Sequence, residues 1–270
     1  MNISFIGGGN MAAALIGGLI SKGFDPRAIR VVEVLPEARE RLNTYYGVEC
    51  FAEPALAAPL GDVIVLAVKP QQMRSVARSV SAYVKEALVL SIAAGIRLPD
   101  LARWLGGQVH LARCMPNTPA LIGMGISGLY AAPAVSAEQR ANAQRILEAV
   151  GRVVWVEEEE LLDPVTAVSG SGPAYVFYFI EAMQQAAVKM GLPDSIARDL
   201  IIDTFRGATE LAARADEPVS NLRERVTSKG GTTERALASM AQDQVAEAIV
   251  KALKAASARA TSLGDELGLD

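Results

Sequence analysis

Three consecutive glycines lie between a short apolar run and a segment with helical spacing. The chain begins MNISFIGGGNMAAALIGGL, where Gly7, Gly9 and Ala12 match the spacing G-x-G-x-x-A. After a strand and before a helix, this spacing is typical of dinucleotide binding. The glycines permit a tight turn and let a pyrophosphate approach the backbone, while the helix N-terminus attracts its charge. The pattern predicts a dinucleotide cofactor, and the alternative is a turn that merely needs glycine.

Charged side chains follow the next predicted strand, IRVVEV. Glu33, near its end, can accept hydrogen bonds from a ribose 2′-hydroxyl and would repel a 2′-phosphate, or it is an ordinary acid at a strand end. Arg39 and Arg41 lie just beyond, where they can bind a 2′-phosphate or form the solvated face of a helix. The sequence therefore predicts a nicotinamide dinucleotide without choosing between NADH and NADPH.

Two other loops follow predicted strands. Lys69 and Pro70 end VLAVKP, and Asn117 stands in RCMPNTP after another strand. Ligands of open parallel sheets bind outside the carboxyl ends of the strands. We expect Lys69 and Asn117 to line the nicotinamide pocket, and the alternative for Lys69 is an ordinary surface lysine.

The elements that must position these residues are a sheet and its covering helices. The β-branched runs ISFI, IRVVEV, DVIVLAV, ALVLSI, QVHLARC, GISGLYAA and GRVVWVE alternate with helical segments. Such alternation predicts an α/β fold with a parallel, Rossmann-like, doubly wound sheet, and a mixed α+β domain is the alternative. Ser136 followed by Gln139 predicts a capping box at the start of the last of these helices. The acidic run from Glu157 to Glu160 is expected to be a solvated helix start.

After Asp163 the apolar spacing is helical to the end of the chain. We therefore predict a dinucleotide-binding domain of residues 1–160 and an all-α domain of residues 161–270. Apolar residues recur along two of its helices at steps of three and four: Ile196, Leu200, Ile201, Phe205, Ala208 and Leu211, and Val245, Ile249, Val250, Leu253 and Ala256. Without a sheet to cover them, these stripes favour a homo-oligomer over a monomer.

Two segments of the helical half place small and hydroxyl residues before a helix. They are VSGSGPAY from Val168 and VTSKGGTTERAL from Val226. Gly230 and Gly231 leave backbone N–H groups bare, and Thr232 or Thr233 is expected to cap the helix that follows. Such a helix start can bind a carboxylate, and the alternative is ordinary capping after a glycine turn.

Composition and charge limit the classes of binding partner that we expect. The chain is 51% hydrophobic with a net charge of −4 and no basic block, so nothing favours nucleic acid or an anionic membrane, and we expect a small-molecule partner. It has no run of about 18 apolar residues and no secretory signal, so a cytoplasmic location is expected. Cys50 and Cys114 are expected to be reduced, buried thiols, and with His110 as the single histidine no metal site is expected.

The motifs GGGNMA, AVKP, SIAAG, RCMPNTPA, VSGSGPAY and TSKGGTT, in this order and spacing, resemble those of pyrroline-5-carboxylate reductase. The resemblance covers almost the whole chain. It implies an N-terminal Rossmann domain that holds NADPH or NADH and a helical C-terminal domain that forms an interlocked dimer, with dimers often assembling into a decamer. It also implies the reduction of 1-pyrroline-5-carboxylate to L-proline, the last step of proline biosynthesis.

The resemblance also implies roles for individual residues. The substrate carboxylate would bind the backbone N–H groups of the loop from Ser228 to Thr233, and the Thr233 hydroxyl would reach the ring nitrogen, which makes Thr233 the candidate catalytic residue. The other implied substrate-binding residues are Ser171, Ser228, Gly230, Gly231 and Thr232. The matched motifs place cofactor contacts at Gly7, Gly8, Gly9, Asn10, Met11, Ala67, Val68, Lys69, Pro70, Ala93 and Asn117.

The chain departs from the family pattern at Lys229, where the loop usually carries proline. The preceding segment is about one residue longer, which puts a substrate contact of Glu217 in doubt.

One rival function is a 3-hydroxy acid dehydrogenase. It needs a lysine base where this chain has SGPAYVFYFIEAMQQAAV, which has none. The other rival is a non-catalytic dinucleotide-binding regulatory protein, which would not need the loop from Ser228 to Thr233.

Overall fold

The computed structural model describes residues 1–269 and divides into two compact units. The first unit is Met1–Ser171 together with the C-terminal residues from Ala255 onward, and the second is Gly172–Lys254. The long last helix therefore contributes to both units. The predicted domains of residues 1–160 and 161–270 were defined by function. The contacts within each unit do not test function, so this division stays a prediction.

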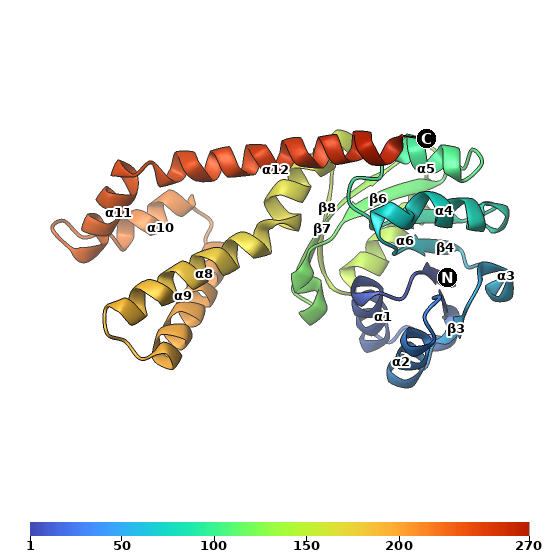
Figure 1. Cartoon of the computed structure of the whole chain (residues 1–270), viewed down its shortest axis with the longest axis horizontal. Coiled ribbons are helices and arrows are strands. Elements are labelled where there is room, and N and C mark those ends of the chain that lie inside the picture. The colour runs from blue at the N-terminus through green and yellow to red at the C-terminus, as the bar shows by residue number, and fades with distance from the viewer. Residues whose placement is uncertain (270) are drawn as a thin grey trace. The chain divides into compact units, whose positions relative to one another are not determined.

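The first unit contains an eight-stranded sheet in the order β3-β2-β1-β4-β5-β6-β7-β8 (Figure 1). Each predicted run holds one strand, and a short additional strand precedes the third run. The strands are β1 (Ile3–Ile6), β2 (Ile29–Val32), β3 (Glu49–Phe51), β4 (Val63–Leu66), β5 (Leu88–Ser91), β6 (Leu111–Met115), β7 (Gly125–Ala131) and β8 (Gly151–Trp155).

One pairing departs from the predicted parallel sheet, because β7 runs antiparallel to β6. Only residues 116–124 join these two strands, and they contain nothing longer than η3 (Thr118–Ile122). A parallel connection needs a crossover of a dozen or more residues, so the chain turns back instead. All other pairings in the sheet are parallel.

Helices cover both faces of the sheet. One face packs against α1 (Asn10–Ser21), α2 (Pro36–Tyr46) and α6 (Ala137–Glu148), and the other packs against α3 (Pro54–Ala57), α4 (Pro70–Val80) and α5 (Leu98–Trp104). Phe5 points to the first face and Ile6 to the second, and both are buried. This double burial explains the continuous apolar strands. The predicted capping box of Ser136 and Gln139 is confirmed at the start of α6.

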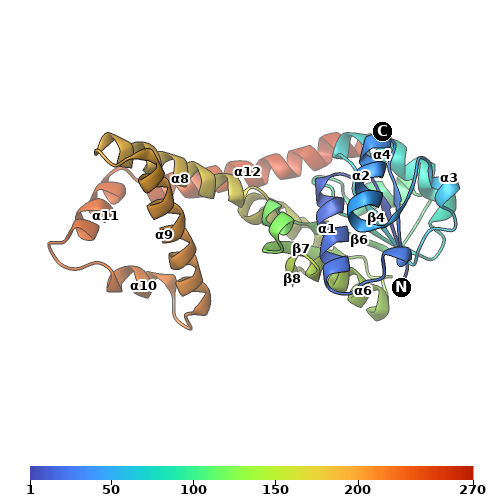
Figure 2. The same ribbon diagram turned by 90° about the horizontal axis from the view of Figure 1, so that it is seen from below.

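After Asp163 the chain is helical, as predicted. Short turns η1 (Pro26–Ala28), η2 (Ser81–Tyr83) and η4 (Glu159–Leu161) complete the first unit, and α7 (Leu162–Val165) and η5 (Thr166–Gly170) lead out of it. The remaining helices are α8 (Gly172–Lys189), α9 (Asp194–Arg214), α10 (Val219–Arg225), α11 (Thr232–Gln242) and α12 (Val245–Gly268). Helices α8 and α9 lie side by side (Figure 2). Within residues 1–269, no helix has the length and apolarity to cross a membrane.

The second unit leaves much apolar surface exposed. Its buried cluster comprises Ala187, Ala197 and Ile201. By contrast, the side chains of Tyr178 and Leu211 are 70% and 68% exposed. An apolar surface of this extent on a small helical unit marks an interface with another chain.

A buried charge cluster fastens the last helix to the sheet unit. Arg113 on β6 is 4% exposed, and its guanidinium lies 3.1 Å from a Glu159 carboxylate oxygen and 3.5 Å from one of Asp163. Thr261 on α12 donates to the other Asp163 oxygen at 2.9 Å, and the Leu98 amide donates to Glu159 at 2.8 Å. The expectation that the acidic run is solvated is therefore wrong for Glu159, because it neutralises a buried arginine.

Replacing Arg113→Met should destabilise the protein by about 3–5 kcal/mol, because two carboxylates lose their buried counter-charge. The matched control is Arg206→Met, whose partner Asp203 lies 3.0 Å away in an exposed pair. The control should cost less than about 1 kcal/mol. Urea unfolding at one protein concentration measures both, and equal small losses would contradict the structural role of the cluster.

Candidate functional site

The first glycine of the predicted motif shapes the turn between β1 and α1. Gly7 adopts φ +100°, which side chains rarely permit, and its amide donates to the Val32 carbonyl at 2.8 Å. A Cβ added there would lie 2.6 Å from the Ala67 carbonyl oxygen. Only glycine fits between these two backbones.

The next two glycines bring the backbone to the start of α1. Gly8 donates its amide to the Glu33 carboxylate at 2.7 Å, and a Cβ there would meet Leu42. Gly9 is the N-cap residue of α1, and a Cβ at this position would meet nothing within 4 Å. The helix start at Asn10 has no side-chain cap and no acidic residue in its first turn. Open space above uncapped amides fits the pyrophosphate of a dinucleotide.

Glu33 is fixed beside this loop rather than free in solvent. Its second carboxylate oxygen accepts from the Leu35 amide at 2.9 Å. Arg39 donates through one guanidinium nitrogen to the backbone oxygens of Glu33 and Val34, at 2.7 and 2.9 Å, and therefore braces this turn. Arg41 is exposed. Glu33 therefore lies at the edge of the candidate dinucleotide site. The guanidinium of Arg39 is already bound to backbone oxygens.

The predicted AVKP residues follow β4, which lies beside β1 in the sheet, and the SIAAG residues follow β5, which lies beside β4. The Ala67 amide donates to the Ile6 carbonyl at 2.8 Å, which holds this segment against the glycine loop. Lys69 is exposed and is the N-cap residue of α4, and Pro70 is its first residue. Ala93 is buried after β5. The predicted cofactor contacts Ala67, Val68, Lys69, Pro70 and Ala93 therefore lie at one carboxyl edge.

Asn117 follows β6 and uses both ends of its amide within the protein. Its oxygen accepts from the Ile126 amide at 3.0 Å, and its nitrogen donates to the Ser169 hydroxyl at 3.3 Å. Asn117 thus joins the loop to η5, a π-helical turn that the Ser171 amide closes on the Thr166 carbonyl at 2.8 Å. Its predicted contact with the cofactor stays a prediction.

The second predicted helix start belongs to α11. Gly230 adopts φ +73°, and the Gly231 amide donates to the Ser228 carbonyl at 3.0 Å, which closes a tight turn. Gly231 is the N-cap residue and no side chain caps the helix. The prediction that Thr232 or Thr233 caps α11 is therefore wrong, because these residues form its first turn. Within residues 1–269, no oxygen accepts a hydrogen bond from either backbone N–H.

The side chains around this loop differ in their surroundings. Thr233 is half-buried, whereas Thr232 and Lys229 are exposed. Glu217, whose substrate contact was in doubt, forms an ion pair with Arg225. Sequence reasoning missed Glu234, whose carboxylate accepts from the Gly230 amide at 2.6 Å. An acid three residues after an N-cap glycine was the available signal.

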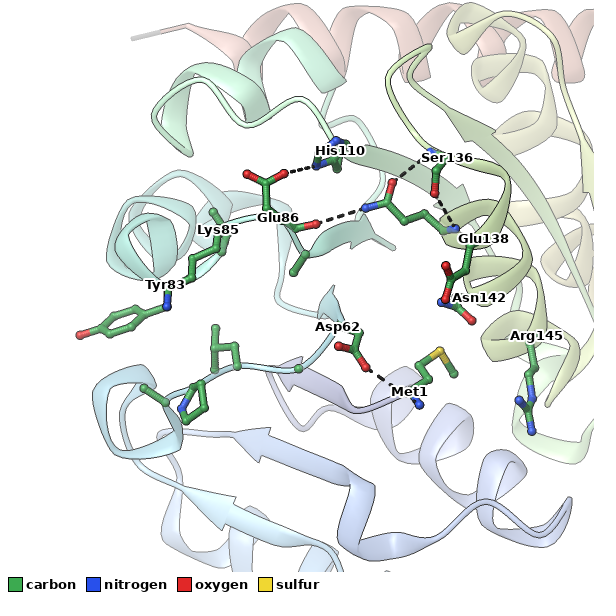
Figure 3. Close-up of a pocket in the computed structure, with 17 residues that line it drawn as sticks. Met1, Asp62, Tyr83, Lys85, Glu86, His110, Ser136, Glu138, Asn142 and Arg145 are labelled. Atoms are coloured by element: carbon green, nitrogen blue, oxygen red, sulfur yellow. Dashed lines mark hydrogen bonds and ion pairs between the residues drawn. The ribbon is translucent and has the colours of Figure 1, made fainter.

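A cavity of about 1020 Å³ lies elsewhere in the first unit (Figure 3). Asp62, Ala87 and His110, at the amino ends of three strands, contribute to its lining, and none of the predicted site residues does. The His110 ring nitrogen lies 3.7 Å from a Glu86 carboxylate oxygen. Residues 1–269 contain no group of three or more histidine, cysteine or acidic side chains that could hold a metal ion.

Two glycine variants should separate folding from cofactor binding. Gly7→Ala should destabilise the protein by about 1–3 kcal/mol because of its positive φ and the close Ala67 oxygen. Gly9→Ala should fold normally but bind NADH and NADPH at least about tenfold more weakly, because the new methyl group stands where the pyrophosphate approaches. Denaturant unfolding and fluorescence titration measure the two effects. Unchanged cofactor affinity in Gly9→Ala would show that the pyrophosphate does not bind at this helix start.

Known proteins resemble the chain along its length. Residues 159–263 match the family model for pyrroline-5-carboxylate reductase dimerisation, and residues 2–95 match the model for coenzyme F420-dependent NADP oxidoreductase. Among solved structures, a pyrroline-5-carboxylate reductase from Coxiella burnetii has a TM-score of 0.91 and 40% identity over 97% of this chain and 98% of that one. The Plasmodium falciparum pyrroline carboxylate reductase with NADP bound has a TM-score of 0.88 and 27% identity over 98% of both chains.

The curated relatives agree with this result. The pyrroline-5-carboxylate reductase of Pseudomonas aeruginosa is 43% identical over 98% of both chains. That of Vibrio alginolyticus is 40% identical over 97% of both chains. Identity at this level over nearly the full length shows that the chain belongs to the pyrroline-5-carboxylate reductase family.

Proposed function

We propose that the protein reduces the C=N bond of 1-pyrroline-5-carboxylate to give L-proline, the last step of proline biosynthesis, with NADH or NADPH as the electron donor. The observation that carries the proposal is the pairing of two uncapped helix starts with family membership over the full chain. The start of α1 suits a pyrophosphate and the start of α11 suits a carboxylate.

Each residue has a limited task in this reaction. A reduced nicotinamide, when bound, would supply the hydride that adds to C5 of the protonated imine, and the C=N double bond would become a C–N single bond. The amides of Thr232 and Thr233 bind the substrate carboxylate. The Thr233 hydroxyl donates a hydrogen bond to the unprotonated ring nitrogen and relays its proton from water, because an alcohol alone is a weak acid. Once the nitrogen is protonated, the hydroxyl oxygen accepts a hydrogen bond from the ring N–H.

The reaction needs no protein nucleophile, because a protonated imine is already electrophilic and positioning supplies much of the rate. The two thiols fit this view. Burial raises the pKa of Cys114 to about 12 and also raises that of Cys50, so both are protonated at neutral pH. No thiolate competes for the imine carbon.

Glu33 bears on the choice of cofactor. Its carboxylate is held between the Gly8 and Leu35 amides, beside the glycine loop where the adenosine ribose of a dinucleotide binds. A fixed negative charge there accepts hydrogen bonds from a 2′-hydroxyl and repels a 2′-phosphate. This favours NADH over NADPH.

The second unit would form the dimer through its exposed apolar face. Phe177 and Tyr178 on α8 are 64% and 70% exposed, and residues 159–263 match a dimerisation model. Burial of these rings against a second copy would supply the core that the unit lacks by itself. Assembly of dimers into a decamer stays a prediction.

An assay with two kinds of substrate tests the function against its two rivals. NADH and NADPH oxidation should be rapid with 1-pyrroline-5-carboxylate, and reduction of NAD or NADP by 3-hydroxy acids should be undetectable. Activity with the hydroxy acids alone would support the dehydrogenase. Tight cofactor binding without either activity would support the regulatory protein.

Thr233→Ala should lower kcat by about 10- to 100-fold, because the hydrogen bond that its oxygen accepts from the charged ring N–H is worth about 1.5–3 kcal/mol. Affinity for NADH and NADPH should be nearly unchanged. Thr209→Ala is the matched control, since its hydroxyl bonds only to backbone oxygens of its own helix at 2.7 and 3.0 Å. Loss of cofactor binding with kcat intact in Thr233→Ala would contradict the assignment.

Glu33→Gln should raise kcat/KM for NADPH relative to NADH by about tenfold, because it removes the charge but keeps an acceptor for the Gly8 amide. Steady-state kinetics with each cofactor measures the ratio. Glu40→Gln, an exposed position in the middle of α2, is the control and should leave the ratio unchanged. A ratio that is equal in Glu33→Gln and the wild-type protein would exclude Glu33 from cofactor selection.

A further inference from the structure

Glu234 places a negative charge at the helix start that is proposed to bind the substrate. It is the third residue of α11, and its carboxylate turns back to accept from the Gly230 amide at 2.6 Å. The side chain is otherwise exposed. An internal carboxylate therefore already occupies the Gly230 amide, which immediately precedes the N-cap residue Gly231.

The turn does not need this hydrogen bond to keep its shape. The Gly231 amide donates to the Ser228 carbonyl at 3.0 Å, and Gly230 provides the positive φ that the turn requires. The first helical bond, from the Arg235 amide to the Gly231 carbonyl, also forms without Glu234. The carboxylate is thus an addition to a turn that is already closed.

A second carboxylate at the same place meets repulsion. Like charges a few ångströms apart disfavour each other, and the Glu234 carboxylate lies within one turn of the amides of Thr232 and Thr233. Because Glu234 is exposed, its carboxylate can leave the Gly230 amide for water at little cost. An arriving carboxylate would have to displace it or bind beside it.

We infer that Glu234 competes with the substrate carboxylate for the start of α11 and so sets the affinity for the imino acid. This inference rests on the proposed function, which places that carboxylate on the amides of Thr232 and Thr233. Glu234 does not contact the reacting atoms, so it changes KM and leaves the hydride-transfer step alone.

Glu234→Gln should lower KM for 1-pyrroline-5-carboxylate by about threefold to tenfold, because the charge is lost while the shape is kept. The value of kcat and KM for NADH should change by less than about twofold, since hydride transfer and cofactor binding lie outside this contact. Glu234→Ala should lower KM as well, because it removes the competitor altogether. If thermal unfolding shows that the alanine variant is unstable, the KM of the glutamine variant alone tests the inference.

Glu247→Gln is the matched control. Glu247 is also an exposed carboxylate at the third position of a helix, in the first turn of α12. Its replacement should leave KM for the imino acid unchanged. A fall in KM with both glutamine variants would indicate a general effect of net charge and would overturn the inference.

Calorimetric titration with L-proline provides a readout that does not depend on turnover. L-Proline should bind Glu234→Gln about threefold to tenfold more tightly than it binds the wild-type protein. An active wild-type enzyme whose Glu234 variants show unchanged or raised KM and unchanged L-proline affinity would overturn the inference alone. A wild-type protein that neither reduces the imine nor binds L-proline would overturn the proposed function, and the inference with it.

Discussion

Backbone N–H groups at a helix start need an acceptor, and this requirement governs the candidate site. Most helices of the sheet unit meet it internally. Helix α6 has the Ser136 capping box, and α4 begins with Pro70, which has no N–H to satisfy. Helices α1 and α11 have neither, since glycine is the N-cap residue of each. The proposed reaction uses both of these uncapped helix starts.

Much of the fold could be predicted from the sequence because burial on both faces of a sheet leaves continuous apolar runs. The remainder depended on features that leave no periodic signal. Strand β3 has three residues, too few for any period, and β7 is antiparallel because its connection to β6 is short. Glu159 lies in a run of four acidic residues, a pattern that predicts exposure to solvent. Its burial follows from Arg113, a residue 46 positions earlier in the chain.

The site was predictable where a residue type is required by the backbone and less so where side chains choose their partners. Gly7 and Gly230 both adopt positive φ, so the sequence pointed to their turns directly. The cofactor contact predicted for Asn117 stays a prediction, and the sequence did not indicate that its amide bonds to Ile126 and Ser169. The contact of Glu234 with Gly230 depends on one side-chain rotamer, which spacing alone does not determine.

The final helix belongs to both compact units of the chain. Helix α12 runs unbroken from Val245 to Gly268, yet its residues from Ala255 onward belong with the sheet unit. There Arg97 pairs with Asp265 at 2.7 Å, and Arg103 donates to the Gly268 carbonyl at 2.7 Å. The dinucleotide-binding unit is consequently not a contiguous stretch of polypeptide. A fragment ending near Ser171 would lack part of its own packing, so it should be less stable than the same unit within the full chain.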